Sequence, residues 1–258
     1  SPRLMILMPP RHGKSELASR MFPPWHLGRH PDHEIIACSY NVGLAMTFSR
    51  KVKEVLEDPS YHTVFEARLN PNHQSAEEWG LADGHRGGYV AAGVGGGITG
   101  KGAHILQIDD PIKNAEEADS GDVREKLWDW YGSTAYTRLA PGGGVLIIQT
   151  WWHDDDLAGR LQMAMAADPE SDQFEVVKYP AIAEFDEWLD SSTDRIVHPN
   201  DLGDEFNPED PTLTLLRRKG DALHPERYDI VKLNRIKKTI PPRFWAALYQ
   251  QNPVPDDG

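Results

Sequence analysis

The chain has 258 residues, of which 39% are hydrophobic and 26% are charged, a composition typical of a globular protein. Its length suits one large α/β domain or a core with a small appendage, and its single cysteine, Cys38, excludes an internal disulfide framework. The net charge of −13 excludes a broad basic surface for nucleic-acid phosphates, and no apolar run approaches the ~18 residues of a membrane span.

Buried apolar runs predict strands, and apolar residues at helical spacing predict helices that follow them. In chain order, the predicted strands span residues 3–8, 34–40, 78–81, 88–92, 104–108, 145–149 and 174–179. The predicted helices span residues 14–22, 42–58, 122–139, 154–166 and 224–238. Strands that alternate with helices imply right-handed crossovers and a mostly parallel central sheet. The sequence therefore predicts an α/β fold.

Local chemistry sets several boundaries of these elements. The first helix should stop before Pro23 and Pro24, and Asn41 should cap the second helix. Six glycines between residues 93 and 102 predict a mobile or tightly turned loop. Periodicity weakens beyond residue 183, so we expect a core over residues 1–183 and a small lid or linker subdomain over residues 184–258, whose last residues resemble a linker.

The strongest motif is the segment from Pro9 to Ser15, between the first strand and the first helix. Gly13 lets the backbone turn so that its amides point at phosphate oxygens. Lys14 is expected to reach the β- and γ-phosphates, and the Ser15 hydroxyl to ligate Mg²⁺. The full P-loop pattern has a glycine where this chain has Met8, and a chance surface turn is the alternative. The strand–loop–helix context favours the P-loop.

A P-loop enzyme also needs a carboxylate at the end of a second strand, where it holds Mg²⁺ through water. Asp109 ends such a strand, and Asp110 follows where many ATPases place a glutamate to polarise the attacking water. Thr150 ends a third strand, the position of a γ-phosphate sensor in additional-strand P-loop ATPases. A turn start at the aspartates and a plain polar strand end at Thr150 remain the alternatives.

Segments distributed over most of the chain carry a more specific pattern. They are Pro9–Glu16, Ile108–Lys113, Trp128–Tyr131, Thr137–Leu139, Thr150–Gly159 and Phe244–Pro253. In order and spacing they resemble the N-terminal ATPase domain of phage terminase large subunits, the motors that package viral DNA. The first two segments resemble its Walker A and Walker B motifs. The chain departs from the branch that it resembles at Trp151, where arginine is usual, and near Asp154, where glutamate is usual.

This resemblance implies a P-loop NTPase of the additional-strand type that uses ATP and Mg²⁺. The residues that would contact the nucleotide and its metal in the P-loop are Pro10, Arg11, His12, Gly13, Lys14, Ser15 and Glu16. Asp109 would be the other metal-binding residue and Asp110 the general base. Arg11 would contact the γ-phosphate, and Thr150 would belong to the motif that couples hydrolysis to movement. Lys101 would be the basic residue that acts on a neighbouring subunit.

The resemblance also implies partners and a location. Double-stranded DNA would be the cargo, moved into procapsids by a homo-oligomeric ring on a portal protein, with a small terminase subunit, in the host cytoplasm and without a membrane. A nuclease domain would follow in the same polypeptide, and this segment would have no nuclease activity. One alternative is a helicase-type P-loop ATPase, which the missing Asp-Glu-x-His box disfavours. Another is a poorly hydrolysing nucleotide-binding scaffold, which Asp110 in place of glutamate favours.

The run His153–Asp156 suggests a metal site at first sight. Adjacent residues on a helix point in different directions, so they do not all face one ion. We expect these acidic residues to stabilise the start of a helix instead.

Overall fold

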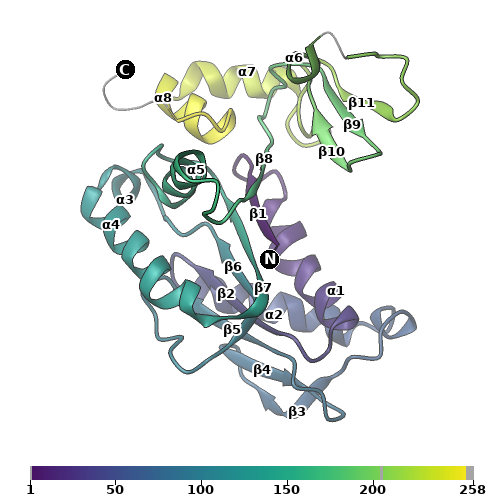
Figure 1. The fold of residues 1–258 in the computed structure, drawn as a ribbon, viewed down its shortest axis with the longest axis vertical. Helices are drawn as coiled ribbons and strands as arrows, with labels where there is room; N and C mark the ends of the chain where they lie inside the picture. Colours follow the sequence, from purple (N-terminus) through teal and green to yellow (C-terminus); the bar gives the residue numbers. More distant parts are fainter. Residues whose placement is uncertain (1, 204–205, 254–258) are drawn as a thin grey trace.

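A computed structural model of the chain describes residues 2–203 and 206–253 (Figure 1). Its main element is an eight-stranded sheet with the order β3-β4-β5-β2-β6-β7-β1-β8. These strands are β1 (Arg3–Leu7), β2 (Glu34–Ser39), β3 (Leu69–Gln74), β4 (Glu78–Leu81), β5 (Gly88–Gly93), β6 (Ala103–Asp109), β7 (Leu139–Gln149) and β8 (Glu175–Lys178). Neighbouring strands from β5 to β8 in this order pair in parallel, whereas β3, β4 and β5 pair antiparallel.

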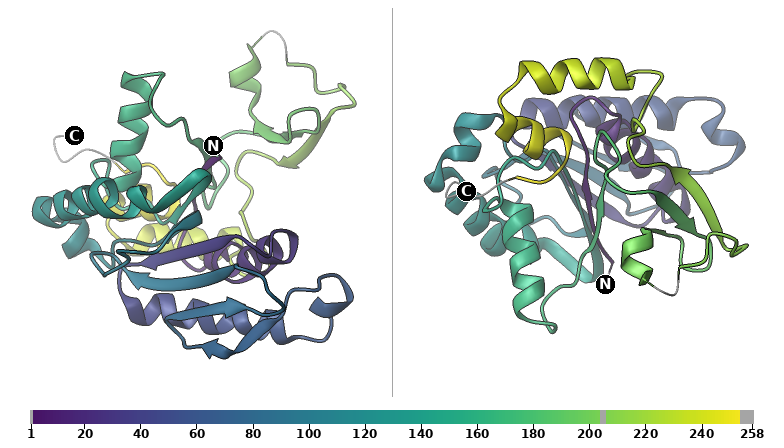
Figure 2. Two further views of the ribbon diagram at one scale, coloured as in Figure 1. Left: turned by 60° about the horizontal axis from the view of Figure 1, so that its bottom comes forward. Right: turned by 90° about the horizontal axis from the view of Figure 1, so that it is seen from above.

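Helices cover both faces of this sheet. They are α1 (Phe22–Arg29), α2 (Val42–Glu57), α3 (Ala115–Asp119), α4 (Gly121–Trp130) and α5 (Leu157–Ala167). Alternate residues of β2 enter two different cores: Ile36 packs in the cluster that contains α4 and α5, and Ile35 in the cluster that contains α1 and α2. Figure 2 shows α2 and α4 on opposite faces of the sheet.

The strand order confirms the predicted fold class. β1, which precedes the P-loop, does not pair with β6, which ends in Asp109; β7 lies between them and pairs in parallel with both. This inserted strand is the defining feature of the additional-strand arrangement. The mostly parallel sheet places the carboxyl ends of all three strands at one edge, where ligands bind in open α/β sheets.

The first helix departs from the prediction that it stops before Pro23 and Pro24. It begins as a π-helix at Glu16–Met21 and continues through both prolines as α1. At the junction the amide of Phe22 donates to the carbonyl of Leu17. The prolines occupy the first turn of the new α-helical segment, where their missing N–H groups and fixed φ are tolerated.

Other boundaries differ in smaller ways. The helix predicted over residues 122–139 is wrong as a single element, because α4, a π-helix (Tyr131–Ala135) and a 3₁₀ turn (Tyr136–Arg138) follow one another in this region. The cap predicted at Asn41 is confirmed: its side chain accepts a hydrogen bond from the amide of Leu44 at 2.9 Å. The helix predicted from residue 154 begins at Leu157, because Asp156 caps it from outside.

The region after residue 183 contains a second, three-stranded antiparallel sheet, although its sequence showed little periodicity. It consists of β10 (Arg195–Val197), β9 (Glu187–Asp190) and β11 (Leu213–Arg217). The helices of this region are α6 (Pro199–Leu202), α7 (Ile230–Thr239) and α8 (Pro242–Phe244), with a short π-helix at Trp245–Tyr249. The helix predicted from residue 224 starts later, at Ile230.

This C-terminal region lies against the end of the large sheet that carries the P-loop (Figure 1). The amide of Ala181 donates to the carbonyl of Tyr249 at 2.6 Å, and Leu233 and Trp245 form a small core with Ala181. The division at residue 183 stays a prediction, and residues 254–258 of the expected linker lie outside the described residues. Over the two described ranges, no helix is both long and apolar enough to cross a membrane.

Candidate active site

The site forms where β1, β6 and β7 end side by side. Leu7 of β1 pairs with Gln149 of β7, and Asp109 of β6 pairs with Ile148 of the same strand. The loop after β1, Asp109 at the end of β6, Asp110 directly after it and Thr150 after β7 therefore meet at one edge of the sheet. The structure brings together the residues that the sequence nominated from three distant segments.

The P-loop is a tight turn that depends on left-handed backbone conformations. Gly13 has φ 99°, which glycine adopts without strain, and Arg11 has φ 62°. A non-glycine residue in this region costs about 1–2 kcal/mol, so the loop stores strain at Arg11. The Arg11 side chain is exposed, whereas those of His12 and Lys14 are buried. The Gly13 carbonyl accepts from the amide of Leu17 at 3.0 Å, which starts the following helix.

Asp110 is held by groups from the P-loop and from the end of β7. Its Oδ2 lies 2.8 Å from the Nζ of Lys14, and its Oδ1 accepts from the backbone amide of Thr150 at 2.9 Å. Its own amide donates to the carbonyl of Ile148, and its φ is 46°. These contacts connect the P-loop, β6 and β7 through one carboxylate.

Asp109 is almost fully buried, with 1% of its surface exposed. Its Oδ1 accepts from the hydroxyl of Ser15 at 3.1 Å, and its Oδ2 from the hydroxyl of Ser19 at 2.6 Å. Burial, and next the charge of Asp110, raise the pKa of Asp109 to about 6; the Ser19 hydrogen bond, the Lys14 charge and the Ser15 hydrogen bond act in the opposite direction. A nearby cation would stabilise the ionised form of this carboxylate.

Thr150 is buried, and Gln149, the residue before it, is hydrogen-bonded to a second buried carboxylate, that of Asp156. Gln149 Nε2 donates to Oδ2 of Asp156 at 2.8 Å, and Asp156 Oδ1 accepts from the amide of Gly159 as the N-cap of α5. Burial raises the pKa of Asp156 to about 7. Asp155 points elsewhere and pairs with Arg160 at 2.8 Å. The acidic run therefore stabilises a helix start through one of its members, Asp156.

The C-terminal region contributes contacts that the sequence did not predict. The ring of Tyr228 stacks on His12 of the P-loop, with ring centroids 4.7 Å apart. The side chain of Gln251 accepts from the amide of Trp151 at 3.1 Å, directly after Thr150. Both contacts join residues separated by 100 or more positions, so no local sequence signal could have revealed them.

Two other nominated residues lie away from the centre of the site. Glu16 pairs with Arg20 on the exposed side of the π-helix. Lys101 lies 2.6 Å from Glu78 and precedes β6, whereas Asp109 ends this strand. At about 3.3 Å per residue, the strand separates Lys101 from the site by roughly 20 Å. Lys101 therefore does not reach the phosphate-binding loop of its own chain.

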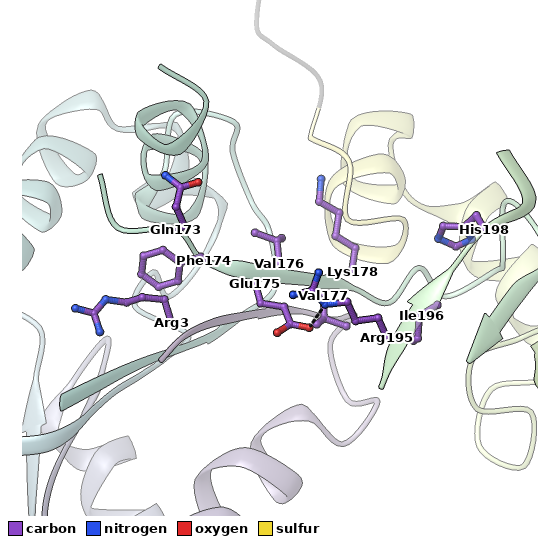
Figure 3. A pocket seen from close by; sticks show the side chains of 10 residues that line it. All are labelled: Arg3, Gln173, Phe174, Glu175, Val176, Val177, Lys178, Arg195, Ile196 and His198. Carbon is purple, nitrogen blue, oxygen red and sulfur yellow. Dashed lines mark ion pairs between the residues drawn. The ribbon is translucent and has the colours of Figure 1, made fainter. Parts of the chain in front are cut away.

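Two cavities elsewhere do not contain the predicted chemistry. One, of about 660 Å³, lies between β8 and β10, where Arg195 and Glu175 approach to 3.6 Å (Figure 3). Another, of about 720 Å³, is an apolar groove lined by residues such as Leu4, Leu17 and Trp25. Neither is lined by the P-loop or by the aspartates after β6.

The residues present fit a magnesium–nucleotide complex. The hydroxyl of Ser15 and the carboxylate of Asp109 are the hard oxygen ligands that Mg²⁺ prefers. Lys14 supplies the cation that phosphate binding requires.

The comparisons with known proteins agree with this fold. Residues 5–228 match the family described as terminase large subunit, T4-like-virus type, N-terminal. The large terminase of bacteriophage HK97 is similar in structure, with a TM-score of 0.55 at 13% identity over 98% of this chain and 47% of that one. The large terminase ATPase domain of Thermus phage P74-26, in a mutant form, has a TM-score of 0.55 at 14% identity, over 98% of this chain and 90% of that one.

No curated protein sequence matches the chain. At these identities the structural matches show the fold alone, and the family match confirms the resemblance found in the sequence. The chain spans about half the length of the HK97 protein.

Proposed function

Because the chain belongs to the family of N-terminal domains of T4-like-virus-type terminase large subunits, we propose that it is a magnesium-dependent ATPase that drives double-stranded DNA into procapsids. The observation that carries the proposal is the meeting of Lys14, Asp110 and Thr150 at the ends of three adjacent parallel strands. The P74-26 relative is itself described as an ATPase domain.

Each side chain has a distinct role in this proposal. Lys14 binds the β- and γ-phosphates, and the exposed Arg11 contacts the γ-phosphate from the same chain. Ser15 and Asp109 hold Mg²⁺, which when bound neutralises charge on the phosphates. Asp110 accepts the proton of the attacking water as general base.

The ion pair between Lys14 and Asp110 supports a switch on nucleotide binding. A phosphate that takes up the Lys14 ammonium removes one of the two contacts of the Asp110 carboxylate. The remaining contact, from the amide of Thr150, keeps the carboxylate at the end of β7. Oδ2 of Asp110 is then free to accept the proton of the attacking water. Oδ1 stays bonded to the amide of Thr150, the residue proposed to couple hydrolysis to movement.

The motor function would need more than this chain. We propose a homo-oligomeric ring on a portal protein in the host cytoplasm, with a small terminase subunit and a downstream nuclease domain as partners. The distance of Lys101 from its own P-loop supports its action on a neighbouring subunit, where the Glu78 contact must first be released.

A poorly hydrolysing scaffold is the second candidate. The observation that favours it is that both Asp110 oxygens are already engaged, one by Lys14 and one by the Thr150 amide. Turnover separates the two candidates, because a scaffold binds ATP without releasing phosphate. No feature of the site favours a helicase-type enzyme.

Steady-state phosphate release from ATP, with Mg²⁺ and with EDTA, tests the proposal. Lys14→Ala should lower the Mg²⁺-dependent rate by ~10²–10³-fold, because the ammonium that faces the phosphates is lost. Lys53→Ala is the matched control, since the Lys53 ammonium, on α2, donates to the carbonyl of Gln74 at the end of β3, on the exposed surface. Equal rates in folded Lys14→Ala and wild-type protein would refute the P-loop assignment.

A further inference from the structure

A series of buried hydrogen bonds leads to Asp109 through Gln107 and Ser19, two residues outside the nucleotide-binding motifs. Gln107 Nε2 donates to the Ser19 hydroxyl at 2.8 Å, and this hydroxyl donates to Oδ2 of Asp109 at 2.6 Å. Ser19 has no exposed surface and Gln107 has 1%. Solvent therefore does not replace these hydrogen bonds when one member is removed.

In these hydrogen bonds the donors point from Gln107 through Ser19 to Asp109. A serine hydroxyl has one proton to donate and lone pairs to accept. Because the Gln107 amide donates to the Ser19 oxygen, the Ser19 proton is directed at the Asp109 carboxylate. Hydrogen bonds to a charged acceptor are about twice as strong as neutral ones, which further favours this orientation.

The two oxygens of Asp109 thus have different partners. Oδ1 faces Ser15, the predicted metal-binding hydroxyl of the P-loop, whereas Oδ2 is occupied by Ser19. When Ser15 gives its oxygen to a metal ion, Oδ1 becomes available to the water shell of that ion. Ser19 still holds Oδ2, so the carboxylate cannot rotate freely about its χ angles.

Local structure explains this placement. Ser15 directly precedes the π-helix Glu16–Met21, and Ser19 lies four residues later, so both hydroxyls lie on the side of the helix that faces β6. Gln107 and Asp109 are two residues apart on β6 and therefore point to the same face of the sheet. The helix and the strand together bring the three side chains into one line.

We propose that Ser19, oriented by Gln107, is a positioning residue that holds the Asp109 carboxylate in the orientation that binds the magnesium ion of the nucleotide complex. This inference rests on the proposed ATPase function. It assigns to Ser19 an effect on metal affinity, not a contact with substrate. Hydrogen bonds from neighbouring side chains to the ligands of a metal ion typically contribute 10–100-fold to metal affinity.

The test is a titration of Mn²⁺, as a paramagnetic substitute for Mg²⁺, into the protein with a non-hydrolysable ATP analogue, followed by electron paramagnetic resonance. Ser19→Ala should raise the apparent Kd for Mn²⁺ by about tenfold. Ser49→Ala is the matched control: Ser49 is also fully buried, and its hydroxyl accepts from Trp79 at 3.0 Å, away from the site. Its Mn²⁺ affinity should equal that of the wild type.

A double-mutant cycle tests whether Gln107 acts on Asp109 through Ser19. Gln107→Met keeps the side-chain size but removes the donor, and should weaken Mn²⁺ binding by about threefold, less than Ser19→Ala does. The double variant should bind like Ser19→Ala alone, because Gln107 acts only through Ser19. In phosphate-release assays, Ser19→Ala should need more Mg²⁺ but reach nearly the wild-type kcat at saturation.

The outcomes separate a failure of the proposed function from a failure of the positioning role of Ser19. Wild-type protein that binds no Mn²⁺–nucleotide complex contradicts the proposed function itself. Wild type that binds it, with unchanged affinity in Ser19→Ala, overturns only the positioning role, as does additivity of the two substitutions. If Ser19→Ala does not fold, Gln107→Met alone carries the test, and an affinity equal to that of the wild type overturns the inference.

Discussion

Asp109 and Asp156 lie in two regions at the same edge of the large sheet, and both are almost fully buried with a raised pKa. Their partners differ. Asp109 accepts hydrogen bonds from two serine hydroxyls and lies beside the Asp110–Lys14 pair. Asp156 accepts from the amide of Gly159 and from the Gln149 side chain, and so closes the start of α5.

The comparison shows why burial alone does not identify a functional carboxylate. The Gly159 amide that donates to Asp156 is held in place by the helix, so this hydrogen bond does not depend on a bound ligand. A hydroxyl can rotate, and the Ser15 hydroxyl can leave Asp109 for a metal ion. We therefore propose metal binding for Asp109, whereas Asp156 caps the start of α5.

The third carboxylate, that of Asp110, differs from both in burial, because its side chain is 27% exposed. Asp110→Asn should lower the rate of ATP hydrolysis by ~10²-fold or more, because general-base catalysis contributes about this much. Nucleotide binding should stay within about threefold of wild type. Hydrolysis at the wild-type rate would show that another residue activates the water.

Substitution of each buried carboxylate by its amide should affect binding of the Mg²⁺–nucleotide complex differently at the two positions. Asp109→Asn should weaken binding of the Mg²⁺–nucleotide complex by roughly 10–100-fold, since it removes the charge that orders the metal ion. Asp156→Asn keeps a side-chain acceptor and should bind the complex like the wild type. Isothermal titration calorimetry measures both, and equal losses would contradict the division of roles.

The reverse holds for stability. Asp156→Ala removes the N-cap of α5 and the acceptor of Gln149, and should lower the free energy of unfolding by about 1–2 kcal/mol. Asp154→Ala is a suitable control, because Asp154 is 38% exposed and does not cap the helix, so its change should stay within about 0.5 kcal/mol. Urea denaturation at pH 6 provides the comparison.

The smallest effect concerns pH. The pKa of Asp156 is about 7 in the folded protein and near 3.8 when unfolded, so the folded state binds more protons between these values. The contribution of Asp156 to stability is therefore fully present below about pH 4 and is lost as the pH rises through 7. Wild type should lose stability relative to Asp156→Asn over this range; parallel urea curves at pH 4 to 7 would contradict the pKa shift.

The sequence predicted the parts of the site that local patterns encode. Gly13, Lys14 and Ser15 follow a buried strand, and Asp109 ends another, so the parallel fold alone places them at one edge. Ser19 escaped notice because a serine within a helix has no distinctive pattern, and its role depends on the position of Gln107.

Other features required tertiary structure. The helix through Pro23 depends on a change from π- to α-helical bonding that propensities do not encode. The contact of Gln251 with Trp151 spans 100 positions. Three short strands formed within residues 187–217 despite weak periodicity, because half-buried strands of three to five residues show little alternation.

A crystal structure with a non-hydrolysable ATP analogue and Mn²⁺, located by its anomalous scattering, would show directly which carboxylate holds the metal ion. We expect Mn²⁺ to be bound by the Ser15 hydroxyl and to contact Asp109 through water, with Lys14 moved from Asp110 to the phosphates. We expect no Mn²⁺ at Asp156. Mn²⁺ at Asp156, or a nucleotide bound away from the P-loop, would contradict the roles proposed for these residues.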